Sequence, residues 1–314
     1  MRPVKMLRKG DTIGLIAPSG STHADGQVEQ AVKAVEKLGL CVVVAPGCYE
    51  KRGFLAGTDE TKLRDLHTFF ADPSIHGIFC IRGGDGASRL LDRLDTNIVS
   101  RNPKVFLGYS DITALHLVFN QKTDFVTFHG PMPATEFIRP DFEDYAQSQL
   151  LRAIMAPEPL GDIVQPLDAP SVETLSPGTV EGELVGGNLT LICALLGTPF
   201  EIDTRGKILL IEDIDEANYR VDRMLTQLRL AGKLEEAAGI AIGDFVNTEP
   251  LDSWKHFPID EVFQDILLPL KKPILKNLPF GHGRNKATLP LGALARVDGP
   301  RSRLIVLEPG VTDS

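Results

Sequence analysis

The sequence lacks several features that mark particular classes of protein. Its four cysteines, Cys41, Cys48, Cys80 and Cys193, form no C-x-x-C pair, so it supports neither a zinc site nor a disulfide framework. Residues 1–12 hold no apolar segment of the kind found in secretion signals, and no apolar run elsewhere reaches the length of a membrane span. We therefore expect a soluble, cytoplasmic protein with no metal and no membrane partner.

The chain also lacks any cluster of basic residues. It carries 33 Lys and Arg against 42 Asp and Glu, which gives a net charge of −9 at pH 7. Such a chain repels a phosphate backbone, so nucleic acid is not an expected partner. With 43% hydrophobic and 24% charged residues, the composition is that of a folded protein, and 314 residues are enough for two domains.

Apolar strands alternate with amphipathic helices through the first half of the chain. Each strand is apolar throughout, which is typical of a parallel sheet with helices on both faces. The expected strands are 12–16, 41–45, 77–81, 104–107 and 124–128. The expected helices include 25–38, 59–71 and a helix after residue 86 that carries Leu90, Leu91 and Leu94. The loops after such strands share one edge of the sheet, where folds of this class place their sites. The loop 82–86 and Ser110 both fall at that edge.

A proline-rich stretch, 156–171, has little periodicity and is the expected linker. It predicts a first domain over residues 1–165 and a second over residues 166–314. The second half of the chain again mixes strands with helices. Its expected strands are 207–212, 239–245, 291–297 and 302–307, and its expected helices are 188–196, 218–231 and a segment near 260–268.

Ser110 stands where the strand 104–107 turns into a helix, in the segment KVFLGYSDIT. This layout is that of a nucleophile elbow, in which a tight turn lifts a hydroxyl above the sheet and the following helix directs its positive end at developing negative charge. Ile112 stands in place of the second glycine of the G-x-S-x-G pattern. A serine between strand and helix is also a common helix cap, so at this point a structural role and a catalytic role both remain open.

Two residues of the second half would complete a catalytic serine. Glu212 ends the apolar run KILLIE, and His282 lies between two glycines in FGHG. Acyl transfer by serine needs a base of near-neutral pKa and an acid that fixes the tautomer of the imidazole. A carboxylate at a strand end and a histidine in a glycine-rich loop are also common solvent-exposed residues, and the spacing alone does not decide between these roles.

Six segments together resemble the successive sequence blocks of the LD-carboxypeptidases, a family of serine peptidases (clan S66) that includes muropeptide LD-carboxypeptidases and microcin C7 self-immunity peptidases. The resemblance runs in order from about residue 8 to about residue 300. The segments are CIRGGDGASRLLDRLD, FLGYSDITALH, FHGPM, GGNLTLICALLGTPFE, ILLIEDIDEANYRVDRMLTQLRLAG and GHGRNKATLPLG.

The resemblance implies an α/β protein with a flavodoxin-like, parallel-sheet N-terminal domain and a smaller, β-rich α+β C-terminal domain. It implies a Ser–Glu–His triad that falls on Ser110, Glu212 and His282, with the nucleophile in one domain and its partners in the other. The bond cleaved in this family joins an L-centre to a C-terminal D-Ala. The resemblance therefore predicts a peptide or muropeptide substrate from cell-wall recycling, no cofactor, and a homodimer.

The same chemistry assigns further roles around the triad. Backbone N–H groups of Asp111, Gly84 and Asp85 would stabilise the oxyanion. The free carboxylate of D-Ala calls for a cation, and the candidates are Arg82, Arg220 and Arg284, each of which is equally suited to a surface ion pair. The family commonly has R-G-G-Y-G where this chain has Asp85 in place of the aromatic residue, so the resemblance does not carry the usual substrate contact over to this position.

Three alternatives stay open on the sequence. The first is an immunity-type peptidase that cleaves an aminoacyl-nucleotide or peptidyl-nucleotide, with Trp254, the only tryptophan, as a stacking partner for the base. The second is a non-catalytic module that binds an anion at the loop 82–86 and the turn 108–111. The third is a Mg²⁺ or Ca²⁺ site at the acidic cluster, which lacks the D-x-D-x-D-G pattern of a calcium loop. The members of that cluster are Glu212, Asp213, Asp215 and Glu216.

Overall fold

The structure is a computed structural model that describes residues 1–142, 145–166, 169–248 and 257–313. The chain divides into two compact units, and each is described by itself. The first unit contains Met1–Glu158, Ala287–Gly292 and Pro309–Ser314, and the second contains Pro159–Lys286 and Ala293–Glu308.

The first unit is built on a sheet of six strands, as far as the described residues show, in the order β13-β6-β5-β4-β2-β3. Numbered along the chain, its parallel strands lie second, first, third, fourth, fifth, which is the flavodoxin-like order. The strands are β2 (Thr12–Ile16), β3 (Cys41–Val44), β4 (Gly77–Cys80), β5 (Val105–Gly108), β6 (Thr127–His129) and β13 (Leu289–Leu291), the last antiparallel to β6. The expected flavodoxin-like domain is confirmed.

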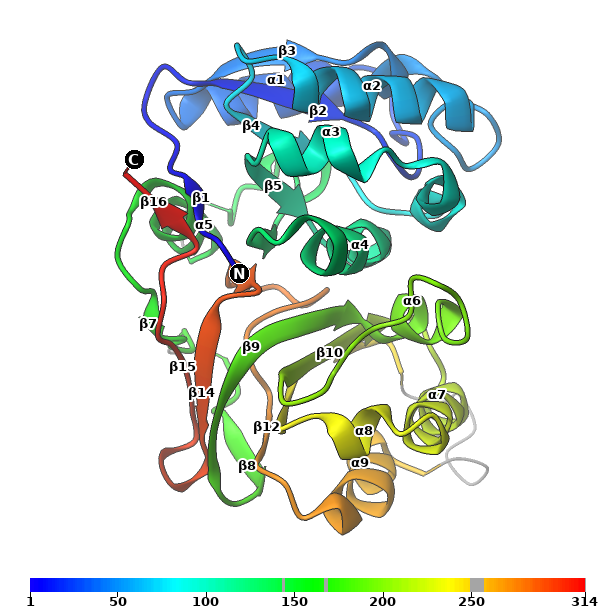
Figure 1. Ribbon diagram of the computed structural model, residues 1–314, viewed down its shortest axis with the longest axis vertical. Helices are drawn as coiled ribbons and strands as arrows, with labels where there is room; N and C mark the ends of the chain where they lie inside the picture. The colour runs from blue at the N-terminus through cyan, green and yellow to red at the C-terminus, as the bar shows by residue number, and fades with distance from the viewer. Residues whose placement is uncertain (143–144, 167–168, 249–256, 314) are drawn as a thin grey trace. The chain divides into compact units, whose positions relative to one another are not determined.

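Helices cover this sheet because each presents an apolar face to it. In α1 the buried residues Val28, Ala31 and Val35 recur at helical spacing. Helices α2, α3 and α4 lie side by side in Figure 1. The helices are α1 (Gln27–Lys37), α2 (Asp59–Ala71), α3 (Thr96–Arg101), α4 (Thr113–Thr123) and α5 (Ala146–Met155).

Segments from the end of the chain complete the first unit. β13 pairs with β6, and β16 (Val311–Thr312) pairs in parallel with β1 (Val4–Lys5) near the N-terminus. The N–H of Val4 donates to the carbonyl oxygen of Gly310 at 3.2 Å. The first unit is therefore completed by residues that follow most of the second unit in the sequence.

The second unit contains an eight-stranded sheet within the described residues, in the order β7-β15-β14-β9-β10-β11-β12-β8. Its long strand β9 (Thr179–Asn188), conspicuously curved in Figure 1, pairs antiparallel with β14 through its first half and parallel with β10 through its second. The other strands are β7 (Gly161–Asp162), β8 (Glu173–Ser176), β10 (Ile208–Ile214), β11 (Gly239–Val246), β12 (Ile274–Lys276), β14 (Leu294–Asp298) and β15 (Arg303–Val306). The expected β-rich α+β domain is confirmed.

Four helices of the second unit are described, and they are short apart from α7. They are α6 (Leu189–Ala194), α7 (Asn218–Leu230), α8 (Lys233–Glu236) and α9 (Ile259–Leu267). Among the helices of the described residues, none is both long and apolar enough to cross a membrane.

Two local expectations differ from the structure. The strand expected at 124–128 begins at Thr127, because Asp124 takes a left-handed conformation (φ 56°) that ends the preceding helix. The helix expected after residue 86 is instead a 3₁₀ turn, Ala87–Arg93, followed by α3. Asp95 starts α3 because its side chain accepts the N–H groups of Asn97 and Ile98.

The core of the first unit contains a cluster of four phenylalanines. Phe106 lies edge-on to Phe119 with 4.9 Å between ring centroids, and Phe70 lies edge-on to Phe119 at 5.5 Å. Phe125 stacks on the same ring at 6.2 Å. Such pairs stabilise a fold beyond the area they bury. The cluster joins α2, β5 and α4 into one core.

We expect Phe70→Ala to lower the free energy of unfolding by about 3–5 kcal/mol, because the side chain is fully buried and would leave a cavity. Phe54→Ala is the matched control, since Phe54 is 67% exposed and its loss should cost less than about 0.5 kcal/mol. Urea unfolding followed by far-ultraviolet circular dichroism measures both. Equal effects of the two substitutions would contradict the assigned core.

Candidate active site

Ser110 occupies a strained turn at the carboxyl end of β5. The strand ends at Gly108, and Ser110 takes a φ of 64°, a conformation that a non-glycine residue adopts at a cost. A 3₁₀ turn, Ser110–Ile112, then leads directly into α4. A Cβ on Gly108 would lie 3.0 Å from Ile112, so the tight turn needs a glycine there. Ser110 thus stands at the positive end of a helix, in the geometry of a nucleophile elbow.

The loop after β4 lies against this turn because β4 and β5 are parallel neighbours. A Cβ placed on Gly83 would be 3.0 Å from the Cβ of Ser110, so the two backbones approach closely. Gly84 has a φ of 116°, which favours glycine. Within the described residues, neither the Gly84 nor the Asp85 N–H donates a hydrogen bond. Both groups are available to an anion held beside this loop.

The side chain of Asp111 joins three strand-end loops, a role that the sequence did not reveal. The buried carboxylate accepts hydrogen bonds from the Ser19 hydroxyl, in the loop after β2, and from the Ala87 N–H at 2.8 Å, after β4. Burial raises the pKa of the Asp111 carboxyl, and the two hydrogen bonds oppose that rise. The sequence predicted only a backbone role for Asp111, because Ser19 and Ala87 are distant along the chain.

Tyr109, beside the nucleophile, is also held by a buried carboxylate. Its hydroxyl donates to Glu136 Oε1 at 2.8 Å, and Glu136 Oε2 accepts the N–H of Met132 at 2.9 Å. The ring of Tyr109 meets that of His129 edge-on at 5.8 Å. These contacts fix the residue before Ser110 and therefore the direction in which the turn leaves β5.

Glu212 lies inside β10, which runs on to Ile214 instead of ending at residue 212. Its side chain is 0% exposed, and the neighbouring Asp213 is 2% exposed, so this part of the strand is buried on both faces. Asp213 accepts hydrogen bonds from Asn188 and Thr190, each at 2.9 Å. Glu212 Oε1 is buried without a hydrogen-bond partner among the described residues. A carboxylate so placed needs a charged or donating partner.

His282 supplies that partner. Its Nδ1 lies 2.6 Å from Glu212 Oε2, a distance typical of a charge-assisted hydrogen bond. Gly281 makes the approach possible, because its φ is 110° and a Cβ there would lie 2.8 Å from Glu212. With Nδ1 committed to Glu212 as donor, the tautomer is set and Nε2 is the nitrogen able to accept a proton. A carboxylate and an imidazole in this arrangement match the acid–base half that the sequence predicts for a hydrolytic triad.

The rest of the acidic cluster has separate partners. Asp215 accepts a hydrogen bond from Asn247 at 2.9 Å, and Glu216 pairs with Arg220 at 3.3 Å. In the part of the chain that the structure describes, no group of three or more His, Cys, Asp or Glu is placed to hold a metal ion. The structure therefore gives the metal alternative no support.

The three candidate arginines differ in setting. Arg82 is half-buried in the loop after β4, its Nη1 donates to the Ser21 carbonyl at 2.6 Å, and burial lowers the pKa of its guanidinium. Arg220 is exposed on α7, and it also bonds the Tyr219 hydroxyl. Arg284 follows the histidine loop. Trp254 lies outside the described residues.

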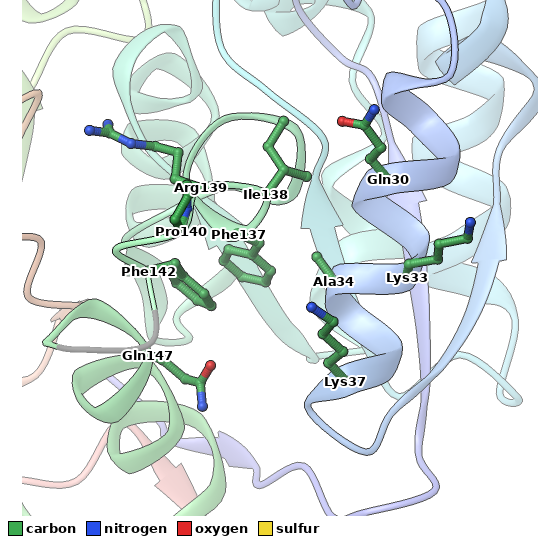
Figure 2. A pocket seen from close by; sticks show the side chains of 10 residues that line it. All are labelled: Gln30, Lys33, Ala34, Lys37, Phe137, Ile138, Arg139, Pro140, Phe142 and Gln147. Carbon is green, nitrogen blue, oxygen red and sulfur yellow. The ribbon is translucent and has the colours of Figure 1, made fainter.

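A cavity of about 360 Å³ lies in the first unit, between α1 and the segment that follows β6. Figure 2 shows Lys33 and Lys37 on the α1 side and the stacked rings of Phe137 and Phe142 on the other, with 4.4 Å between ring centroids. No predicted site residue lines this cavity. It is separate from the residues described above.

Comparison with known protein families identifies the family of this chain. The model of the LD-carboxypeptidase N-terminal domain matches residues 13–130, and that of the LD-carboxypeptidase C-terminal domain matches residues 181–297. The chain belongs to the LD-carboxypeptidase family. The first match contains Ser110, and the second contains Glu212 and His282. The chain is accordingly a serine-type carboxypeptidase.

Two relatives of this LD-carboxypeptidase carry carboxypeptidase names, and a third protein shares the fold. It is 40% identical to the probable murein peptide carboxypeptidase of Bacillus subtilis, over 98% of this chain and 95% of the relative. A muramoyltetrapeptide carboxypeptidase from Oxalobacter formigenes superimposes with a TM-score of 0.81 at 29% identity, over 95% and 99% of the two chains. The microcin C7 self immunity protein MccF, in complex with adenosine monophosphate, superimposes at 0.91 with 24% identity, over 99% and 100%, which shows a shared fold alone.

Proposed function

We propose that the protein hydrolyses an LD peptide bond and releases a C-terminal D-amino acid, D-Ala, from murein tetrapeptide-type substrates in cell-wall recycling. The observation that carries the proposal is the 2.6 Å contact between His282 and the buried Glu212, in a chain that also holds Ser110 in a strained turn at a helix start. The names of the relatives, murein peptide and muramoyltetrapeptide carboxypeptidases, support the substrate class.

Ser110 is the nucleophile, His282 the general base and Glu212 the acid that orients it. His282 Nε2 takes the proton of Ser110 Oγ as the oxygen attacks the scissile carbonyl carbon. The tetrahedral intermediate then collapses, the C–N bond breaks, and the imidazolium gives its proton to the departing amine. Water, deprotonated by the same imidazole, attacks the resulting ester and returns Ser110 to its free form. Glu212 stabilises the imidazolium through its contact with Nδ1.

Backbone N–H groups complete the machinery. Asp111, which follows the nucleophile, supplies one donor to the oxyanion, and the Gly84–Asp85 turn supplies the second. Such donors act without reorganisation because the turn geometry already fixes them. The Asp111 side chain, bonded to Ser19 and Ala87, keeps the two donor loops together.

Arg82 is the first candidate to bind the substrate carboxylate, because it is half-buried and its Nε has no hydrogen-bond partner among the described residues. Arg284 follows as a second candidate, whereas Arg220 is already engaged with Glu216 on the exposed face of α7. Asp85 leaves the loop without the aromatic ring common in the family. A cytoplasmic location and a homodimer accompany the resemblance and stay predictions.

We expect Ser110→Ala to abolish release of D-Ala from a murein tetrapeptide while leaving the circular dichroism spectrum unchanged, because the half-buried side chain lies in a turn and the substitution removes only its hydroxyl. Liquid chromatography of the products measures it. The same assay with a peptidyl-adenylate substrate separates the immunity-type alternative, which is supported by shared fold alone. Near-normal turnover by a pure Ser110→Ala variant would end the serine-peptidase mechanism.

We expect Glu212→Gln to lower kcat on the order of 10²–10⁴-fold, because the amide keeps the shape of the acid and loses the charge that favours imidazolium. Asp215→Asn is the matched control: it removes a nearby carboxylate at a φ of 59°, which Asn tolerates, and should leave kcat within about 2-fold. A crippled Asp215→Asn beside a normal Glu212→Gln would show that the acid is wrongly assigned.

A further inference from the structure

A second carboxylate, Asp244 on β11, holds the loop that carries His282. The backbone N–H of Asp244 donates to the carbonyl oxygen of Phe280 at 2.8 Å, and its side chain accepts the N–H of Gly283 at 3.0 Å. The two bonds lie on either side of His282 in the sequence. Lys286 closes the far end of the loop, since its Nζ donates to the Gly283 carbonyl at 2.6 Å.

A bulge in the sheet places Asp244 in this position. Ile211 of β10 pairs with Ile242, but Asp213 pairs with Phe245, so Gly243 and Asp244 together oppose the single residue Glu212. Bulges of this kind redirect side chains and are frequent beside active sites. The catalytic acid on β10 and Asp244 on β11 therefore meet the same loop from neighbouring strands.

Glycines allow both carboxylates to touch the loop backbone. A Cβ on Gly283 would lie 2.3 Å from Asp244 Oδ2, and a Cβ on Gly281 would lie 2.8 Å from Glu212 Oε2. A Cβ on Gly243 would lie 2.4 Å from the Phe280 carbonyl oxygen. Any side chain at these positions would push the loop away. The glycines on both sides of His282 thus serve close packing against two anions.

The charged groups that face Asp244 are Lys286 and His282 on the loop and Glu212 on β10. Burial raises the pKa of the Asp244 carboxyl to about 6; Lys286 and His282 oppose the rise, and Glu212 adds to it. Asp244 also lines a cavity of about 370 Å³ in the second unit, together with Arg284, Asn277 and Asn285. Protons can exchange with the carboxyl through this cavity.

We propose that Asp244 is a positioning residue whose ionised side chain holds the Gly281–His282–Gly283 loop in its working geometry and whose protonation lowers turnover. The inference rests on the proposed function. A charged acceptor makes a hydrogen bond about twice as strong as a neutral one. Protonation of Asp244 therefore weakens its hydrogen bond with the Gly283 N–H. Misplacement of a reacting group by about 1 Å costs up to about 10²-fold in rate.

The test compares the kcat of the wild type with that of Asp244→Asn from pH 5 to pH 8, on a murein tetrapeptide. Above pH 7 Asp244 is ionised, so the ratio of wild-type to variant kcat should be roughly 10. As the pH falls through about 6, the wild-type carboxyl takes up a proton and becomes neutral, like the amide, so the ratio should fall toward 1.

Asp298→Asn is the control, because Asp298 is also buried in the second unit, at 5% exposure, and pairs with Arg301. Its ratio should stay near 1 at every pH. A ratio for Asp244→Asn that is above 1 but constant with pH would reduce Asp244 to a structural residue, and a ratio of 1 throughout would leave it no role. Either result overturns the proposal.

A second variant tests the role of Asp244 even where Asp244→Asn does not fold. Lys286 lowers the pKa of Asp244, so Lys286→Met should move the acid limb of the kcat profile to higher pH, and an unmoved limb would contradict the proposal. The two failures are distinguishable. An active Ser110→Ala variant would refute the proposed function, whereas an inactive Ser110→Ala with a flat ratio would refute the role of Asp244 alone.

Discussion

The hydrogen bond between the buried Glu212 and His282 is the constraint on which the site of the second unit depends. A carboxylate that is 0% exposed is costly unless a hydrogen-bond donor meets it, and His282 Nδ1 lies 2.6 Å from Glu212 Oε2. To bring the imidazole so close, the chain places glycines on both sides of the histidine and a bulge opposite Glu212. The bulge in the sheet, the glycine-flanked histidine loop and Glu212 therefore all contribute to one arrangement.

In the first unit the constraint is different: the structure holds a serine in an unfavourable backbone conformation. Ser110 has a φ of 64°, and strain of this kind persists only where surrounding contacts fix it. Those contacts are made by two buried carboxylates. Asp111 ties the turn to the loops after β2 and β4, and Glu136 holds the hydroxyl of Tyr109. In each unit, buried carboxylates thus hold backbone segments in position in addition to any catalytic role.

The sheet of the first unit was predictable because its strands are apolar throughout and alternate with amphipathic helices. Ser110 was recognisable from the strand–turn–helix setting, and Glu212 and His282 from the resemblance to a family. Asp111, Glu136 and Asp244 were not, because each acts on segments that are distant in the sequence. The return of residues 287–292 and 309–314 to the first unit was equally invisible, since their apolar runs look like ordinary strands.

The most direct measurement of the central claim is covalent labelling of the whole chain by a serine-directed fluorophosphonate, followed by mass spectrometry of its peptides. The account predicts one adduct, on Ser110, formed rapidly by the wild type and at least about 10²-fold more slowly when His282 is replaced by alanine. An adduct on another residue would contradict the account. So would labelling of Ser110 at an unchanged rate without His282.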